Sequence, residues 1–155
     1  MKTLIAIFCF ILFTGATCKP NKSDHPVVEV AVATANNIAD GTVTVKCSGV
    51  GNNETLAMIE AEKKAFRLLL FYGYPSSTPQ ISPMVEDEAK TLAANPAFFE
   101  QFFDKGGYKT FIIRSNNASV GTSGLKFYLV RELQINVRSL RPYLEQNNII
   151  RKFGF

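Results

Sequence analysis

The sequence is poor in the residues on which most active sites depend. Its single histidine, His25, lies in a polar segment near the N-terminus. Because histidine titrates near neutral pH and is a frequent zinc ligand, this scarcity argues against most acid–base and zinc chemistry. The G-x-S-x-G motif of serine hydrolases is also missing. A pair of catalytic carboxylates stays open as an alternative, because such pairing is a property of the folded chain. We predict a protein that is not an enzyme and uses neither a cofactor nor a metal.

The sequence also lacks an apolar run of membrane-spanning length near its N-terminus. The run Leu4–Phe13 is shorter than the stretch of about 20 residues that a spanning helix needs. It follows Lys2 and precedes the small residues Thr14–Thr17, which is the order typical of a cleaved export signal. Residues 1–17 are therefore predicted to be a signal peptide.

Cysteine is scarce, and the position of one cysteine indicates how the chain is anchored. Cys18 directly follows the small residues, as in bacterial lipoprotein signals, where a lipidated cysteine becomes the mature N-terminus. Several acyl chains make a stable anchor, since each buried CH₂ contributes about 0.8 kcal/mol. Gly15 and Thr17 depart from the strict lipoprotein pattern, so an ordinary signal cut after Ala16 is the alternative.

A polar segment separates this cysteine from the folded part of the chain. Residues 18–40 contain prolines and are predicted to form a lipid-anchored tether. Within it, the β-prone run Val27–Thr34 is either an edge strand or a loose arm. Cys47 has no histidine in the folded part, which argues against a thiol nucleophile and favours a small buried side chain. If Cys18 is not lipidated, a disulfide between Cys18 and Cys47 is the alternative in an oxidising compartment.

The core of a single domain, residues 41–155, is predicted to form around its first strand and helix. In Thr42–Cys47, two valines and the cysteine alternate with polar residues, the pattern of a strand with one buried face. Gly49 and Gly51 then permit the chain to reverse direction. A long amphipathic helix is expected to follow, so that strand and helix together supply the core.

That helix is predicted over Glu54–Tyr72, with Asn52 or Asn53 as its N-cap and Gly73 as a left-handed C-cap. An alanine row marks the centre of its buried side and predicts a close approach to the sheet. The row consists of Ala57, Ala61 and Ala65. Leu68 continues this row, and longer apolar residues are expected to fill the space on both sides of it. Those residues are Met58, Leu69 and Tyr72 on one side and Leu56, Ile59, Phe66 and Leu70 on the other.

The rest of the chain is divided by prolines and glycines. The expected elements are helices Pro83–Ala94 and Ala97–Asp104, strands Tyr108–Ser115 and Leu125–Val137, and a C-terminal helix Leu140–Gln146. Ser82 and Ser139 are the expected N-caps. Asn116–Gly124 is expected to be a loop too long for a two-residue turn. Arg131 interrupts an apolar strand face, which predicts either a bulge or an overhanging strand end.

These elements predict the fold class. We expect an α+β domain in which an antiparallel sheet of three or four strands packs on one long helix, with two short inserted helices and a C-terminal helix. Pro142 is expected in the first turn of the last helix, where proline is tolerated. The chain lacks the many alternating lipid-facing strands of a membrane barrel.

Two features provide candidate interaction residues. A phenylalanine cluster is interpreted as a lid on the core, with an exposed aromatic patch as the alternative. Charge is uneven: residues 101–155 contain nine Lys or Arg and three Asp or Glu (+6), against seven and ten (−3) in residues 18–100. The preferred interpretation of this distribution is an ordinary solvated basic surface, with an anionic partner (anionic lipid, lipopolysaccharide or an acidic protein surface) as the alternative. The candidate residues are Phe98, Phe99, Phe102, Phe103, Arg131, Arg138 and Arg141.

The motifs of the first strand, the long helix and the late strand resemble the twenty-kilodalton membrane-associated lipoprotein family, and also the N-terminal domain of the flagellar assembly protein T. The residues that carry the resemblance are Gly49 and Gly51, the alanine row, Leu68–Leu70 and the segment Glu132–Glu145. The resemblance spans roughly residues 41–145. It implies a non-catalytic envelope module of a Gram-negative cell and supplies no catalytic residues. Here Tyr74–Lys105 is an insertion relative to that pattern.

The resulting functional prediction is a lipid-anchored cell-envelope protein that acts through protein–protein contact, in the assembly of an envelope complex. The alternative is a periplasmic module that binds an anionic or lipidic ligand. The expected partners are the membrane, through the anchor, and a protein of unknown identity; export argues against nucleic acid. Because Lys19–Lys22 carries no acidic residue after Cys18, we expect the outer membrane, facing the periplasm.

Overall fold

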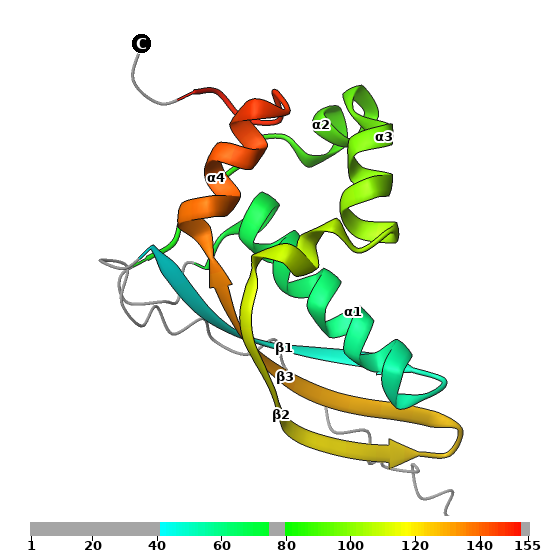
Figure 1. Cartoon of the computed structure of the whole chain (residues 1–155). Helices are drawn as coiled ribbons and strands as arrows, with labels where there is room; N and C mark the ends of the chain where they lie inside the picture. Colours follow the sequence, from blue (N-terminus) through cyan, green and yellow to red (C-terminus); the bar gives the residue numbers. More distant parts are fainter. Residues whose placement is uncertain (1–40, 75–79, 153–155) are drawn as a thin grey trace, which may run out of the picture.

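A three-stranded antiparallel sheet forms the base of the molecule (Figure 1). The computed structural model describes residues 41–74 and 80–152, so the predicted signal peptide, Cys18, the tether and its arm Val27–Thr34 lie outside the described residues. The strands are β1 (Thr42–Gly51), β2 (Ile112–Ser123) and β3 (Lys126–Asn136), in the spatial order β1-β3-β2. The predicted α+β class is confirmed, with three strands in the described sheet.

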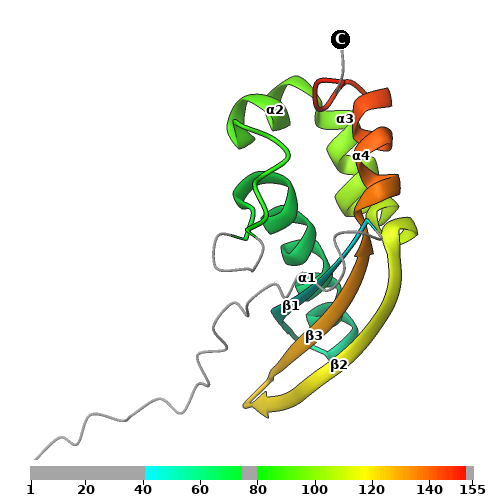
Figure 2. The ribbon, with the colours of Figure 1, turned by 90° about the vertical axis from the view of Figure 1, so that its left-hand side faces the viewer.

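The helices lie on one face of the sheet and beyond one of its ends. Figures 1 and 2 show α1 along one face, no described helix on the opposite face, and the other helices gathered past the sheet end. The helices are α1 (Glu54–Arg67), α2 (Glu88–Ala94), α3 (Pro96–Phe99) and α4 (Val137–Gln146). Shorter turns extend or connect them: π-helical turns at Leu68–Tyr72 and Glu100–Asp104, and a 3₁₀ turn at Gly107–Phe111.

Close packing of α1 on β1 follows from small residues on both sides of the contact. The predicted alanine row, Ala57, Ala61 and Ala65, is fully buried. Gly49 and Gly51 face it, and a Cβ on Gly49 would lie only 2.0 Å from the Ala57 carbonyl oxygen. The prediction that these glycines reverse the chain is wrong, because β1 continues through both and the glycines instead make room for the helix backbone.

The ends of this helix agree only in part with the prediction. Asn53 is the N-cap, accepting a 2.8 Å hydrogen bond from the Leu56 N–H. At the other end the chain continues as a π-helical turn and stops at Gly73, whose φ of 68° and ψ of −166° require glycine but differ from the predicted left-handed helical cap. Leu56 and Tyr72 are exposed, so the buried side is narrower than expected.

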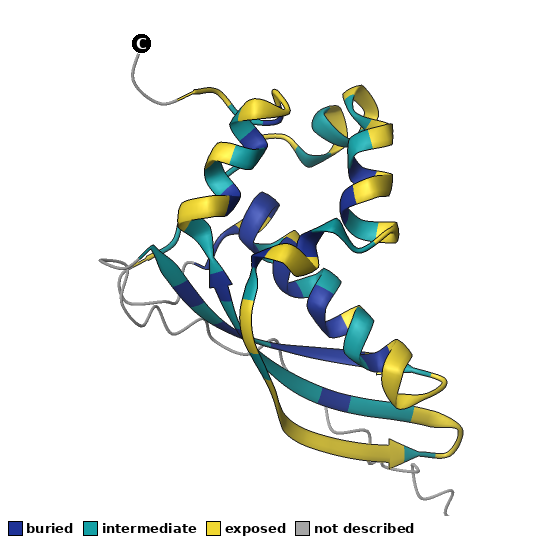
Figure 3. Cartoon of the chain, viewed as in Figure 1, coloured by how far each residue is buried: buried dark blue, intermediate teal, exposed yellow. Residues whose placement is uncertain are grey.

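The main core lies between the second half of α1, the sheet and α4. Figure 3 shows the buried residues on the sheet side of α1 and along the middle of β1 and β3. Apolar side chains from all of these elements pack together here, including Val45, Phe66, Leu69, Leu133, Ile135, Leu140 and Leu144. A second, smaller cluster joins Ala57 and Ala61 to Leu129.

The predicted helix Pro83–Ala94 begins later than expected. The Met84 and Val85 N–H groups donate to the Leu70 carbonyl at 2.9 and 2.8 Å, which holds this segment in a non-helical course. The helix α2 therefore starts at Glu88, with the Asp87 side chain as its N-cap instead of Ser82. It ends before Asn95–Pro96 as predicted, and α3 with its π-helical turn covers the predicted helix Ala97–Asp104.

The second strand differs most from the prediction. Tyr108 belongs to a 3₁₀ turn, and β2 covers the segment predicted as a loop, Asn116–Gly124, almost completely. A two-residue turn, Gly124–Leu125, connects β2 to β3, since Ser123 pairs with Lys126. The small polar residues of β2 have low strand propensity, so the sequence pattern did not predict a strand there. Pairing with β3 holds this segment in the sheet.

The last helix begins three residues before the predicted start. The Asn136 side chain accepts a 3.1 Å hydrogen bond from the Ser139 N–H, so Asn136 is the N-cap and Val137 begins α4. Pro142 consequently lies inside the helix, where it has no N–H to donate to the Arg138 carbonyl. The earlier helix start and the internal position of Pro142 both arise because the capping residue, Asn136, is the last residue of β3.

Candidate functional site

Arg131 shows neither of the two predicted irregularities. It keeps its register in β3, opposite Cys47 of β1 and Asn117 of β2. The register shifts of the sheet lie in β2, between Ile112 and Arg114 and between Asn117 and Ser119. Arg131 therefore stays on the helix-covered face, and a partner must compensate its charge there.

Glu62 of α1 is that partner. Its Oε1 lies 3.0 Å from the Arg131 Nε, in an ion pair whose alignment falls short of a hydrogen bond. The Arg131 Nη atoms donate to Asn117 and Ser115 at 2.9 Å each. The side chains of Glu62 and Arg131 are only 9% and 15% exposed. The network joins α1 to both β3 and β2 and so acts as a structural connection.

Tyr108 completes this network from the 3₁₀ turn. Its hydroxyl donates a 3.1 Å hydrogen bond to the Glu62 Oε2. Burial, followed by the neighbouring Glu62 carboxylate, raises the pKa of Tyr108 above its usual value. Tyr108 therefore stays protonated at neutral pH and remains a hydrogen-bond donor to Glu62.

The phenylalanine cluster is a lid on the core. Phe99 and Phe102 are buried, and Phe98 and Phe103 are half-buried. Phe102 packs edge-on against Phe66 of α1, with ring centroids 5.8 Å apart. The lid interpretation is confirmed, because Phe99 and Phe102 belong to the main core cluster, and the fully buried ring of Phe102 is out of reach of a partner in this conformation.

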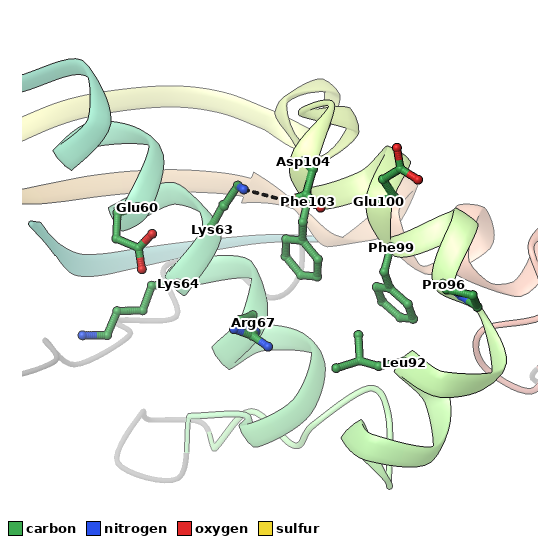
Figure 4. Close-up of a pocket in the computed structure, with 10 residues that line it drawn as sticks. All are labelled: Glu60, Lys63, Lys64, Arg67, Leu92, Pro96, Phe99, Glu100, Phe103 and Asp104. Atoms are coloured by element: carbon green, nitrogen blue, oxygen red, sulfur yellow. Dashed lines mark hydrogen bonds and ion pairs between the residues drawn. The ribbon is translucent and has the colours of Figure 1, made fainter. Parts of the chain in front are cut away.

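An open groove lies between α1 and the lid (Figure 4). Arg67 and Lys63 of α1 form one wall, while Phe99 and Phe103 provide an apolar wall opposite. Its volume is about 470 Å³. Lys63 pairs with Asp104 at 2.9 Å, and Arg67 pairs with Glu88 at 3.2 Å, so both cations already have acidic neighbours.

A second open cleft, of about 640 Å³, separates α2 from α4 and the C-terminal tail. Four cationic residues line it: Lys90, Arg141, Arg151 and Lys152. Two acidic residues, Glu86 and Asp87, line the same cleft. The candidate Arg141 thus lies with other cations, whereas Arg131 is in the buried network and Arg138 is exposed at the start of α4.

Cys47 is a free, buried thiol, and Cys18, its partner in the alternative disulfide, lies outside the described residues. Burial raises the pKa of the Cys47 thiol to about 11, although a hydrogen bond with Tyr74 and the charge of Lys64 act in the opposite direction. At neutral pH the group is therefore a neutral thiol. This agrees with the expected role as a small core side chain.

Sequence reasoning missed Glu62, although a signal for it exists. Glu62 is an acidic residue on the apolar side of a helix, and Arg131 is a basic residue on the apolar face of a strand. Buried charges are paired, so two opposite exceptions in one domain indicate contact with each other. The two surface clefts left no such signal, because they depend on how the inserted helices pack.

Comparison of the chain with protein-family models, with curated proteins and with solved structures found no match. Among the described residues, no helix has the length and apolar character needed to cross a membrane. The fold and its surfaces are therefore the basis on which a function is proposed.

Proposed function

We propose that this protein is a non-catalytic, lipid-anchored component of a Gram-negative cell envelope that acts through contact with another protein. Cys18 is the proposed site of lipid attachment, and the outer membrane, facing the periplasm, is the proposed location. The domain presents an extended surface to a partner, and the anchor keeps that surface near the membrane. Assembly of a larger envelope complex is the proposed role.

The observation that carries the contact proposal is the exposure of β2. This strand pairs only with β3 among the described strands, so its outer edge is open, and nine of its twelve residues are exposed. Ile113 and Val120 remain 52% and 54% exposed. An open edge with unpaired backbone groups favours addition of a partner strand.

Site-specific photo-crosslinking in cells tests this contact. A photoreactive residue at Asn116 or Val120 of β2 should yield one adduct of defined mass. The same residue at Glu60, exposed on the outer side of α1, should yield none. Equal adducts from Glu60, or no adduct from either β2 position, would contradict the proposal.

Metabolic labelling with a fatty acid tests the anchor separately. The wild-type chain should incorporate the label and fractionate with membranes, and Cys18→Ala should lose the label. Label retained by Cys18→Ala, or absent from the wild type, would contradict lipid attachment at this cysteine. A signal cut after Ala16 would then be the better explanation.

A second candidate function is binding of an anionic amphiphile, favoured by the groove between α1 and the lid. Its cationic wall suits an anionic head group, and its aromatic wall suits an alkyl chain. Titration with dodecyl phosphate should show binding that weakens at least about fivefold in Arg67→Gln. Lys105→Gln removes an exposed cation outside the groove and should bind like the wild type. Equal affinities of all three chains would exclude this function.

A further inference from the structure

Five of the fourteen Lys and Arg residues in the described part of the chain form ion pairs of 3.2 Å or less. Lys46, Lys63, Arg67, Lys105 and Arg131 each form an ion pair with an acidic residue. Their charge is locally compensated and contributes little to attraction at a distance. The cations that remain are therefore those that decide which surface attracts an anionic partner.

Several of the remaining cations gather at one end of the molecule. Lys90, Arg151 and Lys152 line the cleft between α2 and the tail and form no ion pair with any described residue. Arg138 at the start of α4 is exposed and likewise has no described ion pair. Arg141, one helical turn later, lines the same cleft and contacts Glu145 across 4.0 Å, so it is partnered and adds positive charge to the cleft. We call these five residues the basic end.

Acidic residues at this end do not cancel its charge. Glu86 and Asp87 line the cleft, but the Asp87 side chain is engaged as the N-cap of α2, accepting from the Lys90 N–H at 2.9 Å. With Glu145, three acidic residues stand against the five cations. The excess positive charge of residues 101–155 is thus concentrated in part at this end.

One member of the basic end, Arg138, lies beside the point where the chain enters the described domain. The Arg138 N–H donates a 2.9 Å hydrogen bond to the carbonyl of Gly41, the first described residue. A Cβ on Gly41 would lie 2.6 Å from the Arg138 Cβ, so the two segments are in direct contact. Figure 1 shows the start of β1 beside the start of α4. A lipid attached upstream through this segment keeps the basic end within reach of the membrane.

We propose that the basic end docks on the anionic phospholipid head groups of the leaflet that holds the lipid anchor, which rests on the proposed anchor at Cys18. Arginine binds phosphate through two parallel hydrogen bonds, and three of the five cations are arginines. Cations spread along a helix and a tail suit a plane of negative charge. Docking orients the domain and leaves β2, which lies on the sheet, available to a protein partner.

Vesicle binding of the unlipidated Cys18→Ala full-length chain tests this docking. Vesicles of phosphatidylcholine with phosphatidylglycerol are compared with vesicles of phosphatidylcholine alone, at low and high salt. In this background, Arg138→Gln/Arg141→Gln/Arg151→Gln/Lys152→Gln should lower the preference for anionic vesicles at least about tenfold. The matched control, Lys105→Gln/Lys109→Gln/Arg114→Gln/Lys126→Gln, removes the same charge elsewhere and should lower it less than about twofold.

A smaller variant keeps the test valid if the fourfold change disturbs α4. Arg151→Gln/Lys152→Gln alters only the exposed tail and should lower the preference about threefold at unchanged melting temperature. Equal losses in the basic-end and control variants, or no loss in either, would overturn the proposal. The proposal would also be overturned if the basic-end variant bound vesicles like its parent but lost the β2 crosslink. That result would assign the basic end to contact with an acidic protein. Failure of fatty-acid labelling would refute the anchor alone, because this assay uses unlipidated chains.

Discussion

At the scale of single residues, the pair Glu62 and Arg131 should dominate the polar contribution to stability. Glu62→Gln keeps the size of the side chain but leaves the Arg131 charge uncompensated in a site that is only 15% exposed. Loss of one partner from a buried pair costs several kcal/mol, reduced here because Asn117 and Ser115 still accept from Arg131. We expect the free energy of unfolding, measured in urea, to fall by about 2–3 kcal/mol.

Glu132→Gln is the matched control for this change. Glu132 neighbours Arg131 in β3 and pairs with Lys46 at 3.1 Å. This pair is open to solvent, since the side chain of Lys46 is 44% exposed and that of Glu132 is 35% exposed. Exposed ion pairs contribute about 0–1 kcal/mol, so the control should lose less than about 1 kcal/mol. Similar losses in the two variants would show that burial does not distinguish these pairs.

Cys47 should give the protein a measurable loss of stability at alkaline pH. Its pKa of about 11 in the fold exceeds that of an unfolded cysteine, about 8.5, so folding favours the protonated thiol. This contribution is complete below about pH 8.5 and is lost as pH rises toward 11. Between about pH 8 and pH 10.5, the wild type should lose about 2 kcal/mol relative to Cys47→Ala, measured by urea unfolding.

The alkaline effect needs a comparison with other titrating groups. Burial also raises the pKa of Tyr74 and Tyr108, and both tyrosines are retained in Cys47→Ala. The effect of Tyr108 cancels in the difference, whereas the pKa of Tyr74 is also raised by Cys47, so the difference reports the coupled pair of Cys47 and Tyr74. Cys18→Ala changes a cysteine of the predicted tether and should keep the wild-type pH profile. An identical slope in the wild type and Cys47→Ala would refute the role of the thiol.

The sequence identified single residues best where local pattern alone sets their environment. The alanine row was predicted and the N-cap was narrowed to Asn52 or Asn53, because helical periodicity and capping are properties of neighbouring residues. Arg131 was recognised as unusual, but its partner was not, since Glu62 is distant in sequence. Tyr108, which completes the network, was also missed, because it was assigned to a strand and lies in a 3₁₀ turn.

At the scale of elements, the contact between β1 and α1 should be the least tolerant part of the fold. A Cβ on Gly49 would lie 2.0 Å from the Ala57 oxygen and 2.5 Å from the Ala61 nitrogen, both backbone atoms. Backbone cannot move aside as a side chain can, so helix and sheet must separate. Gly49→Ala should therefore lower the free energy of unfolding by about 3 kcal/mol, measured in urea or by melting temperature.

Gly121→Ala provides the control in the same sheet. Gly121 lies in β2, and a Cβ there would meet nothing within 4 Å. Alanine also loses less conformational freedom on folding than glycine, by roughly 0.5–1 kcal/mol, so this variant should be as stable as the wild type or more so. Equal destabilisation of both variants would mean that strand propensity, and not helix approach, explains the effect.

The elements that sequence patterns failed to place are those held by distant backbone bonds. The Leu70 carbonyl accepts from Met84 and Val85, which delays α2 beyond the expected Ser82 cap. Similarly, β2 has small polar residues typical of a loop but pairs along its length with β3. In both cases tertiary hydrogen bonds override local propensity, and no window of neighbouring residues contains that information.

At the scale of the whole molecule, stability should be distributed unevenly, and hydrogen exchange can map it. The central strand β3 pairs on both sides and carries the buried residues Leu129, Leu133 and Ile135. In contrast, α2 has no buried residue, and Glu88 at its start contacts Arg67 of α1 and Tyr72 of the π-helical turn that follows α1. Amides of β3 should exchange at least about a hundredfold more slowly than those of α2.

The helix α4 provides the comparison that makes this prediction specific. It is also short and lies beyond the sheet end, yet it buries Leu140 and Leu144 in the main core. If burial sets local stability, α4 should exchange more slowly than α2 despite its internal proline. Glu88→Ala should further speed exchange in α2 while leaving β3 unchanged, because its contacts are exposed and outside the core. Uniform protection of α2, α4 and β3 would instead require that the inserted helices unfold only together with the sheet.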